Sequence, residues 1–306
     1  MTRRVLMGAL ALVAAALVSA CSGSGKPADP GAKGPLKVVC TTRIIADTVR
    51  QLAGESVEVQ SLMGPGVDPH LYKATASDVV KLRGADLVFY NGLHLEGKMI
   101  EVLESLGKQK PVIAVGDSVD KSKLLTPPEF QGLADPHIWF DVSMWLQAAD
   151  GASDALVRHD PAHADEYRQR AARLGNDLSQ LHEWCLQQAA TVPRERRVLV
   201  TSHDAFNYFG RAYGFEVVGL QGISTVTEAG TSDVAQMVDL IKARRIPAVF
   251  VESSVPKAAI ERVSEDSGAR IGGELFSDSM GAPGTPQGTY QGMIRHNVGL
   301  VVEALK

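Results

Sequence analysis

The apolar residues of this chain fall into two alternating patterns. Short runs rich in Val and Ile, typical of buried strands, are separated by longer segments in which apolar residues recur at helical spacing. The runs form two sets of four, at residues 37–41, 57–62, 86–90 and 111–115, and at 197–201, 215–219, 248–251 and 270–272. Between them lie helix-like segments such as 44–53, 75–83 and 234–244. The alternation predicts an α/β fold of two lobes, each a four-stranded parallel sheet with flanking helices.

One long amphipathic segment lies between the two sets of strands. Asp160 and Pro161 are typical of a helix start, as an N-cap followed by proline at the first helical position. Apolar residues then recur at alternating steps of four and three, namely Tyr167, Ala171, Leu174, Leu178, Leu181 and Cys185. A helix over 161–190 would be roughly 45 Å long, enough to lie along both lobes and join them. A helix contained within one lobe is the alternative.

The beginning of the chain has the pattern of an export signal. Arg3 and Arg4 precede an apolar run of about fourteen residues, whereas a helix needs about twenty to cross a bilayer. The run ends in small residues before Cys21, which resembles a bacterial lipobox. We therefore expect a signal peptide over 1–20 and lipidation of Cys21, with an ordinary signal peptide as the alternative. Residues 21–35 offer almost nothing to a core and are predicted to be a lipid-anchored flexible tether.

The rest of the chain divides around the long helix. We predict an N-terminal lobe over 36–160, a linking helix over 161–191 and a C-terminal lobe over 192–306, sizes that are ordinary for domains. The 31 Lys and Arg residues are balanced by 35 Asp and Glu without a basic cluster, which argues against a nucleic-acid partner. Cys40 and Cys185 are interpreted as buried free thiols, with a disulfide as the alternative.

Four residues with metal-ligating side chains occupy similar places. His70, His203 and Asp278 each follow a predicted strand, while His137 lies in the second of two Asp-Pro-His triplets, at 68–70 and 135–137. Because ligands bind beyond the carboxyl ends of strands, facing lobes would bring three imidazoles and one carboxylate together. Such a set suits one Zn²⁺, or Mn²⁺ if the carboxylate is bidentate. Taken singly, a histidine after a strand is more often a structural residue, and the triplets could be unrelated turns.

Three further residues are expected near these four. His94 and Glu96 follow the strand at 86–90, and we interpret them either as contacts behind the ligands or as structural residues. Glu252 ends the strand at 248–251 and could orient a ligand imidazole. Trp139, two residues after His137, is interpreted as a packing residue.

Several long runs resemble the TroA-like metal-binding proteins of zinc and manganese ABC importers. They are LMGPGVDPHLYKATASDV, LVFYNGLHLEGKM, DPHIWFDV, RRVLVTSHDAFNYFGRAYGFEVVGLQGIST and GGELFSDSMG, and the resemblance covers essentially all of 36–306. It implies two lobes of parallel sheet joined by one rigid helix, with a metal buried between them. The family's ligands fall on His70, His137, His203 and Asp278.

The resemblance leaves the metal open between zinc and manganese. Some members carry Glu at the position of His203 and are associated with manganese, whereas dedicated zinc scavengers often carry a histidine-rich loop before the second ligand. Residues 121–134, which precede that ligand here, contain no histidine. The chain therefore has neither the glutamate associated with manganese nor the histidine-rich loop of dedicated zinc scavengers.

The resemblance implies an extracytoplasmic solute-binding protein rather than an enzyme. It would capture one Zn²⁺ or Mn²⁺ and deliver it to the permease of an ABC importer in the cytoplasmic membrane. We expect a monomer anchored by lipid at the outer face of the cell membrane, in the periplasm if an outer membrane is present. A surface adhesin lipoprotein is one alternative. A zinc hydrolase is another, although Asp278 would fill the open metal position and the sequence has no His-Glu-x-x-His motif.

Overall fold

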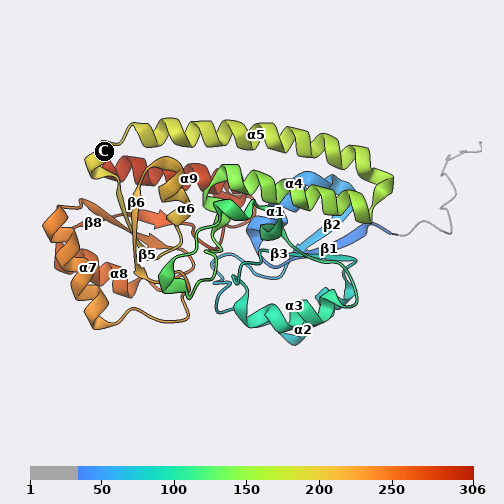
Figure 1. Cartoon of the computed structure of the whole chain (residues 1–306), viewed down its shortest axis with the longest axis horizontal. Helices are drawn as coiled ribbons and strands as arrows, with labels where there is room; N and C mark the ends of the chain where they lie inside the picture. The colour runs from blue at the N-terminus through green and yellow to red at the C-terminus, as the bar shows by residue number, and fades with distance from the viewer. Residues whose placement is uncertain (1–33) are drawn as a thin grey trace, which may run out of the picture. The chain divides into compact units, whose positions relative to one another are not determined.

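A computed structural model describes residues 34–306 of the chain, and residues 35–306 form one compact unit (Figure 1). The predicted signal peptide, Cys21 and nearly all of the predicted tether lie outside the described residues. Within the described part, no helix combines the length and apolar character needed to cross a membrane.

The first lobe is built on the four-stranded parallel sheet that the sequence predicted. Its strands are β1 (Leu36–Cys40), β2 (Val57–Ser61), β3 (Leu87–Tyr90) and β4 (Val112–Ala114), in the order β2-β1-β3-β4. Its flanking helices are α1 (Arg43–Ala53), α2 (Ala76–Gly84) and α3 (Ile100–Gly107). Side chains alternate along β1, so that Val38 and Cys40 join one hydrophobic core and Val39 joins another on the opposite face. The sheet is therefore covered on both faces.

The second lobe also has four strands, but they form two parallel pairs. The strands are β5 (Val198–His203), β6 (Glu216–Gln221), β7 (Ala248–Glu252) and β8 (Arg270–Leu275), paired as β5 with β6 and β7 with β8. Its helices are α6 (Asn207–Tyr213), α7 (Thr231–Arg244), α8 (Ala258–Ser267) and α9 (Tyr290–Leu305). All eight predicted strands and the parallel sheets are confirmed. The prediction of one continuous four-stranded sheet in this lobe was wrong, because β5 and β7 lie side by side without pairing. At the end of β5 the backbone amide of His203 donates to the Glu252 side chain (2.8 Å) rather than to a β7 carbonyl.

The predicted linking helix is α5 (Ala164–Ala190), 27 residues long. It begins later than predicted because Pro161–His163 form a 3₁₀ turn. The Asp160 carboxylate accepts hydrogen bonds from His163 Nδ1 (2.7 Å) and the Tyr167 hydroxyl (2.5 Å), which ties this turn to the helix. A further helix, α4 (Val142–His159), was not predicted and packs beside α5. Figure 1 shows α5 running over α4 toward the first lobe and over α9 toward the second.

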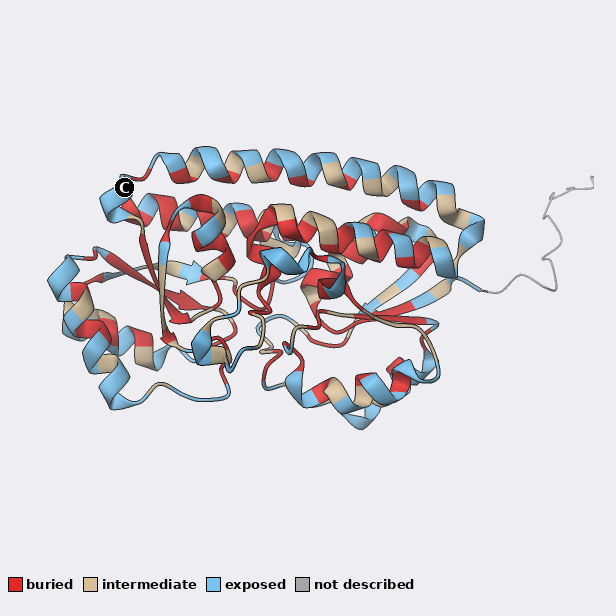
Figure 2. Ribbon diagram, viewed as in Figure 1, coloured by how far each residue is buried: buried red, intermediate tan, exposed pale blue. Residues whose placement is uncertain are grey.

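The two lobes share one hydrophobic core on the side of α5. The largest cluster of buried side chains draws on α1, α4, α5 and α9 together with strands of both lobes. Two smaller clusters belong to single lobes, one beneath α2 and α3 and one beneath α7 and α8. Figure 2 shows the exposed face of α5 turned outward and its buried face turned toward α4 and α9. Rotation of one lobe against the other would therefore disturb a continuous core as well as bend a helix.

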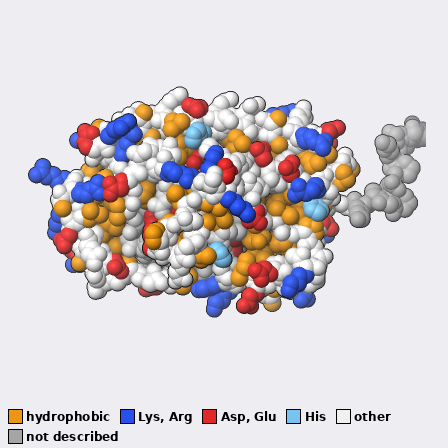
Figure 3. Space-filling model, viewed as in Figure 1, with side chains coloured by type: hydrophobic (Ala, Val, Ile, Leu, Met, Phe, Trp, Pro, Cys, Tyr) orange, Lys and Arg blue, Asp and Glu red, His pale blue; other side chains and the backbone are white. Residues whose placement is uncertain are grey.

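Cys40 and Cys185 are buried free thiols, as predicted. Burial raises the pKa of both groups, so both thiols stay protonated at neutral pH. On the face drawn in Figure 3, acidic and basic side chains are interspersed, which agrees with the small net charge of −4.

Candidate metal centre

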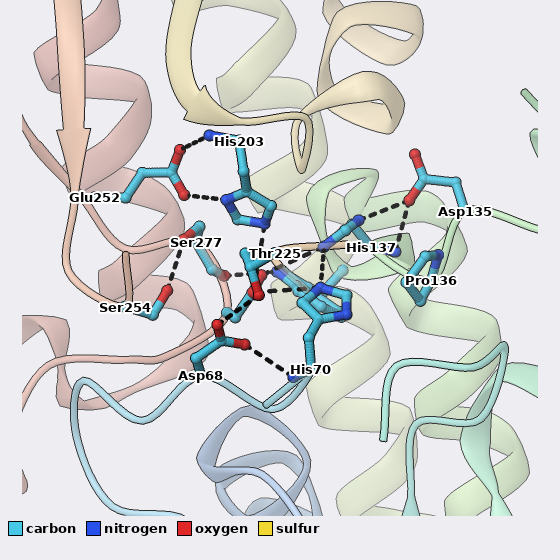
Figure 4. A network of polar contacts seen from close by, with 12 residues as sticks. Asp68, His70, Asp135, Pro136, His137, His203, Thr225, Glu252, Ser254 and Ser277 are labelled. Carbon is cyan, nitrogen blue, oxygen red and sulfur yellow. Dashed lines mark hydrogen bonds and ion pairs between the residues drawn. The ribbon is translucent and has the colours of Figure 1, made fainter. Parts of the chain in front are cut away.

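The structure brings together the four residues selected from the sequence. His70 lies in the loop after β2, His137 just before a 3₁₀ turn at Ile138–Phe140, and Asp278 in the loop after β8. His203 is the last residue of β5 rather than a loop residue. One ligand atom of each residue lies within 4.8 Å of those of the other three, and all four side chains are buried. Figure 4 shows the three imidazoles turned toward one another.

The donor atoms of the four side chains face one another. Asp278 Oδ1 lies 3.4 Å from His137 Nε2, and Asp278 Oδ2 lies 3.4 Å from His203 Nε2 and 3.6 Å from His70 Nε2. His70 Nε2 and His137 Nε2 are 3.3 Å apart. Among the described residues, both Asp278 oxygens and His203 Nε2 are buried without a hydrogen-bond partner. Three imidazole nitrogens and a carboxylate are a donor set for one zinc or manganese ion, and such an ion would satisfy these buried polar atoms.

A carboxylate orients the imidazole of His137. Asp135 Oδ1 accepts hydrogen bonds from His137 Nδ1 (2.7 Å) and from the His137 backbone amide (2.9 Å). Asp135 is held in turn by Asn207 Nδ2 at its other oxygen (3.2 Å) and by the Tyr208 hydroxyl at its carbonyl (2.9 Å). Because Nδ1 donates, Nε2 of the neutral ring presents its lone pair to the centre.

Glu252 orients His203 in the same way. Its Oε2 accepts from His203 Nδ1 (2.5 Å) and its Oε1 from the His203 backbone amide (2.8 Å). Glu252 is the last residue of β7 and is fully buried. It therefore lies behind the imidazole of His203, one of the four ligand candidates (Figure 4).

His70 is held by its backbone instead. The Asp68 carboxylate accepts from the His70 backbone amide (2.8 Å) through one oxygen and from the Thr225 hydroxyl (2.6 Å) of the second lobe through the other. The Gly66 amide donates to the Ser279 hydroxyl (2.8 Å), also in the second lobe. Hydrogen bonds thus fasten the loop that carries His70 to the opposite lobe. In the part of the chain that the structure describes, no carboxylate is bonded to His70 Nδ1.

Glu96 and His94 have different surroundings. Glu96 is fully buried and accepts hydrogen bonds from Thr41 Oγ1 (2.7 Å) and from the Asn91 and Gly92 amides (2.7 and 3.2 Å). Asn91 Nδ2 donates to the carbonyl of Pro136 (3.0 Å), so Glu96 is connected to the backbone beside His137. His94 is exposed and none of the hydrogen bonds of the described residues joins it to the four ligand candidates.

Nearby carboxylates keep two of the imidazoles basic. Burial disfavours the charged ring of His137, but Asp135 and Asp278 outweigh burial and raise the pKa of His137 to about 9. For His203, Glu252 and Asp278 overcome the same effect of burial and raise its pKa well above the ordinary value.

The pKa values of His70 and Asp278 are both lowered. Burial, reinforced by the neighbouring imidazoles and opposed by Asp278, lowers the pKa of His70 to about 3. Burial would raise the pKa of Asp278, but His203 and His137 hold it well below its ordinary range. The centre therefore contains an ionised carboxylate, one neutral imidazole and two imidazoles that bind protons readily.

The aspartates of the two Asp-Pro-His triplets were missed in the sequence. In each triplet the aspartate accepts the backbone amide of the histidine two residues later, 2.8 Å for His70 and 2.9 Å for His137. Asp side chains commonly close such turns, and proline fixes the intervening backbone. The repeated triplet was therefore the signal that could have assigned Asp68 and Asp135 as well as the histidines.

Comparison with known proteins gives consistent matches over nearly the whole chain. The model of the family "Zinc-uptake complex component A periplasmic" matches residues 38–304. The manganese-binding lipoprotein MntA of Bacillus subtilis is 46% identical over 310 residues, covering 99% of this chain and 100% of MntA. The zinc-binding protein TroA of Treponema pallidum is 46% identical over 282 residues, covering 90% of this chain and 91% of TroA.

The solved structures agree with the sequence matches. The structure of the periplasmic zinc-binding protein TroA from Treponema pallidum superposes with a TM-score of 0.87, covering 89% of this chain and 99% of that one. The two-lobe fold and the TroA-like resemblance are thereby confirmed. The chain belongs to the zinc-uptake complex component A family of metal-binding proteins.

Proposed function

We propose that this protein binds one divalent transition-metal ion, zinc or manganese, between the lobes formed by 36–160 and 192–306 and delivers it to an ABC importer. His70, His137, His203 and Asp278 are the ligands. The observation that carries the proposal is the set of four buried donor atoms within 4.8 Å of one another, two of whose residues leave polar atoms unpartnered. Relatives that are equally similar to this chain are named for manganese and for zinc.

The donor set favours zinc over manganese in the purified protein. Three nitrogens and one oxygen suit a tetrahedral zinc site, and divalent affinity generally rises from manganese toward zinc at a given site. Which ion is bound in the cell also depends on supply. Titration of the metal-free protein with each ion would rank the two affinities.

Capture explains this site better than hydrolysis does. A hydrolytic zinc keeps one position open for water, whereas four protein donors would fill a tetrahedral site here. We infer that the protein works as a monomeric carrier and passes its ion to a permease in the cytoplasmic membrane.

Metal uptake by cells tests this proposed function. Deleting the gene should reduce uptake of zinc or manganese and slow growth in chelator, and the wild-type gene should restore both. A copy carrying His137→Ala should restore neither. Unchanged uptake after deletion, or full rescue by that variant, would contradict the proposal, and loss of attachment alone would favour an adhesin.

We propose that a lipid on Cys21 anchors the mature protein at the outer face of the cell membrane. Cys21→Ala should then abolish incorporation of labelled lipid and release the protein from membranes. Continued lipid labelling of the variant would contradict the anchor.

Removing the carboxylate behind His203 should weaken metal binding without removing a ligand. Glu252→Gln is expected to lower zinc affinity by about 10–100-fold, because partners behind the ligands fix ring orientation and basicity. Glu274→Gln, at an exposed carboxylate of β8 paired with Lys257, is the control and should bind as the wild type does. Competition with a chromophoric chelator measures both, and equal affinities would refute a positioning role for Glu252.

Metal binding should change the relative orientation of the two lobes little, and it should raise the thermal stability of the protein strongly. The shared core and the unbroken α5 resist rotation, so small-angle scattering of metal-free and zinc-bound protein should give nearly the same radius of gyration. At free zinc about 1000 times above Kd, the melting temperature should rise by about 10 °C. A large compaction would contradict the rigid connection, and an unchanged melting temperature would contradict tight capture.

A further inference from the structure

Trp139 contacts the ligand regions of both lobes. We propose that Trp139 is a positioning residue that fixes the separation between His137 of the first lobe and Asp278 of the second. The inference rests on the proposed function, because it concerns the geometry of the same metal centre. Trp139 is buried in the shared hydrophobic core, which confirms its interpretation as a packing residue, and the positioning role is proposed in addition.

The indole ring makes one contact to each ligand region. Its Nε1 donates to the carbonyl of Ser277 (3.0 Å), the residue before Asp278. Its ring lies edge-on to the His137 imidazole, with centroids 5.2 Å apart and planes at 70°. Trp139 is 1% exposed, so water does not compete for this hydrogen bond.

The backbone of Trp139 is also held from the second lobe. The buried Tyr290 hydroxyl donates to the Trp139 carbonyl (2.7 Å). The Tyr290 amide, at the start of α9, donates to Asp47 of α1 (2.8 Å). Trp139 is therefore fixed at both its carbonyl and its indole N–H, and the two bonds reach different elements of the second lobe.

Trp139 acts on the loop that carries Asp278 through the carbonyl of Ser277, which accepts the indole hydrogen bond. The Ser277 hydroxyl is bonded to Ser254 (2.9 Å), so the residue is held from its side chain and from its carbonyl. Losing the indole donor would leave a buried carbonyl unpaired, and the loop would shift to find another donor. Zinc–ligand distances tolerate only a few tenths of an ångström, so such a shift would remove Asp278 from its bonding distance.

A matched pair of tryptophan variants tests the inference. Trp139→Phe removes the indole N–H and keeps an aromatic ring. Trp145→Phe removes an equally buried indole N–H, which donates to Thr48 Oγ1 (3.0 Å) rather than to a ligand loop. The phenylalanine keeps an aromatic ring against Tyr290, on which Trp145 stacks with centroids 5.6 Å apart. We expect Trp139→Phe to weaken zinc binding by about 10–100-fold, the usual effect of losing a group that supports a ligand. Trp145→Phe should lower the melting temperature of the metal-free protein similarly and leave zinc affinity unchanged.

Cobalt separates a change of geometry from a loss of stability. The visible absorption spectrum of bound Co²⁺ reports the arrangement of its ligands, so it should change in Trp139→Phe and match the wild type in Trp145→Phe. Tyr290→Phe provides a second variant if Trp139→Phe does not fold. It frees the Trp139 carbonyl and should weaken zinc binding and alter the cobalt spectrum in the same direction.

The outcomes separate this inference from the proposed function. Wild-type zinc affinity and cobalt spectrum in Trp139→Phe, or in Tyr290→Phe where only that variant folds, would overturn the positioning role. Equal weakening by Trp145→Phe would overturn it too, because the effect would then be general destabilisation. Failure of the wild-type protein to bind either zinc or manganese would overturn the proposed function instead.

Discussion

Replacing Asp278 by Ala is expected to weaken zinc binding by about two to three orders of magnitude. Four-ligand zinc sites gain about 10–16 kcal/mol, or roughly 2.5–4 kcal/mol per ligand, and 1.4 kcal/mol is a factor of ten. Asp278 is also the residue that lies within 3.6 Å of all three imidazoles. Its loss removes both a donor and the negative charge that offsets a buried cation.

Chelator competition on metal-free protein measures this effect, with circular dichroism to check the fold. The fold should survive, because Asp278 lies in the loop after β8 and outside the hydrophobic clusters. Asp239→Ala, at an exposed position of α7, removes a carboxylate that is not among the four grouped donors and serves as the control. Near-normal affinity in Asp278→Ala would place the ligands elsewhere.

Zinc affinity should fall steeply as the pH is lowered from about 8 to about 6. An imidazolium cannot bind metal, so each proton that zinc must displace reduces the affinity up to tenfold per pH unit. The pKa of His137 is raised to about 9 and that of His203 lies well above the ordinary value, so both rings hold protons in this range. The pKa of His70 is lowered to about 3, so that ring is already neutral. We therefore expect a loss of up to about 100-fold per pH unit.

Titrations at several pH values give this slope directly. Calorimetry in buffers of different ionisation enthalpy gives the number of protons released, which should approach two. A flat profile would contradict a histidine-dominated centre. A release of three protons would show that His70 is protonated before it binds.

The strands were predictable because their signal is local. Alternation along β1 and β5 sends neighbouring side chains to different cores, and each run ends at a turn or a polar residue. The split of the second sheet was not predictable, because pairing between β5 and β7 is a non-local contact; at the ends of these strands the His203 amide donates to the Glu252 side chain. The start of α5 was misplaced for a local reason, since a proline after an N-cap residue also fits the 3₁₀ turn at Pro161–His163.

His70, His203 and Asp278 were predictable from their places after strands, and His137 from the repeated Asp-Pro-His triplet. Most of the partners of these residues were not predictable. Glu252 could be proposed because it ends a strand beside His203 in the fold topology. Thr225, by contrast, reaches Asp68 from a loop with no motif, and Trp139 reaches Ser277 across 138 residues of sequence. Such contacts exist only after the lobes have packed through their shared core. The sequence pattern predicts which side chains can bind a metal and their order along the chain. The distances between these side chains are set by tertiary packing.

Anomalous diffraction from crystals of the zinc-bound protein tests the central claim most directly. Data collected on both sides of the zinc absorption edge locate the ion without assumptions about its ligands. We predict one anomalous peak at the lobe interface, about 2.0–2.2 Å from the Nε2 atoms of His70, His137 and His203 and from an oxygen of Asp278. A principal peak bound to other residues, or one that leaves any of these four side chains uncoordinated, would contradict the assignment.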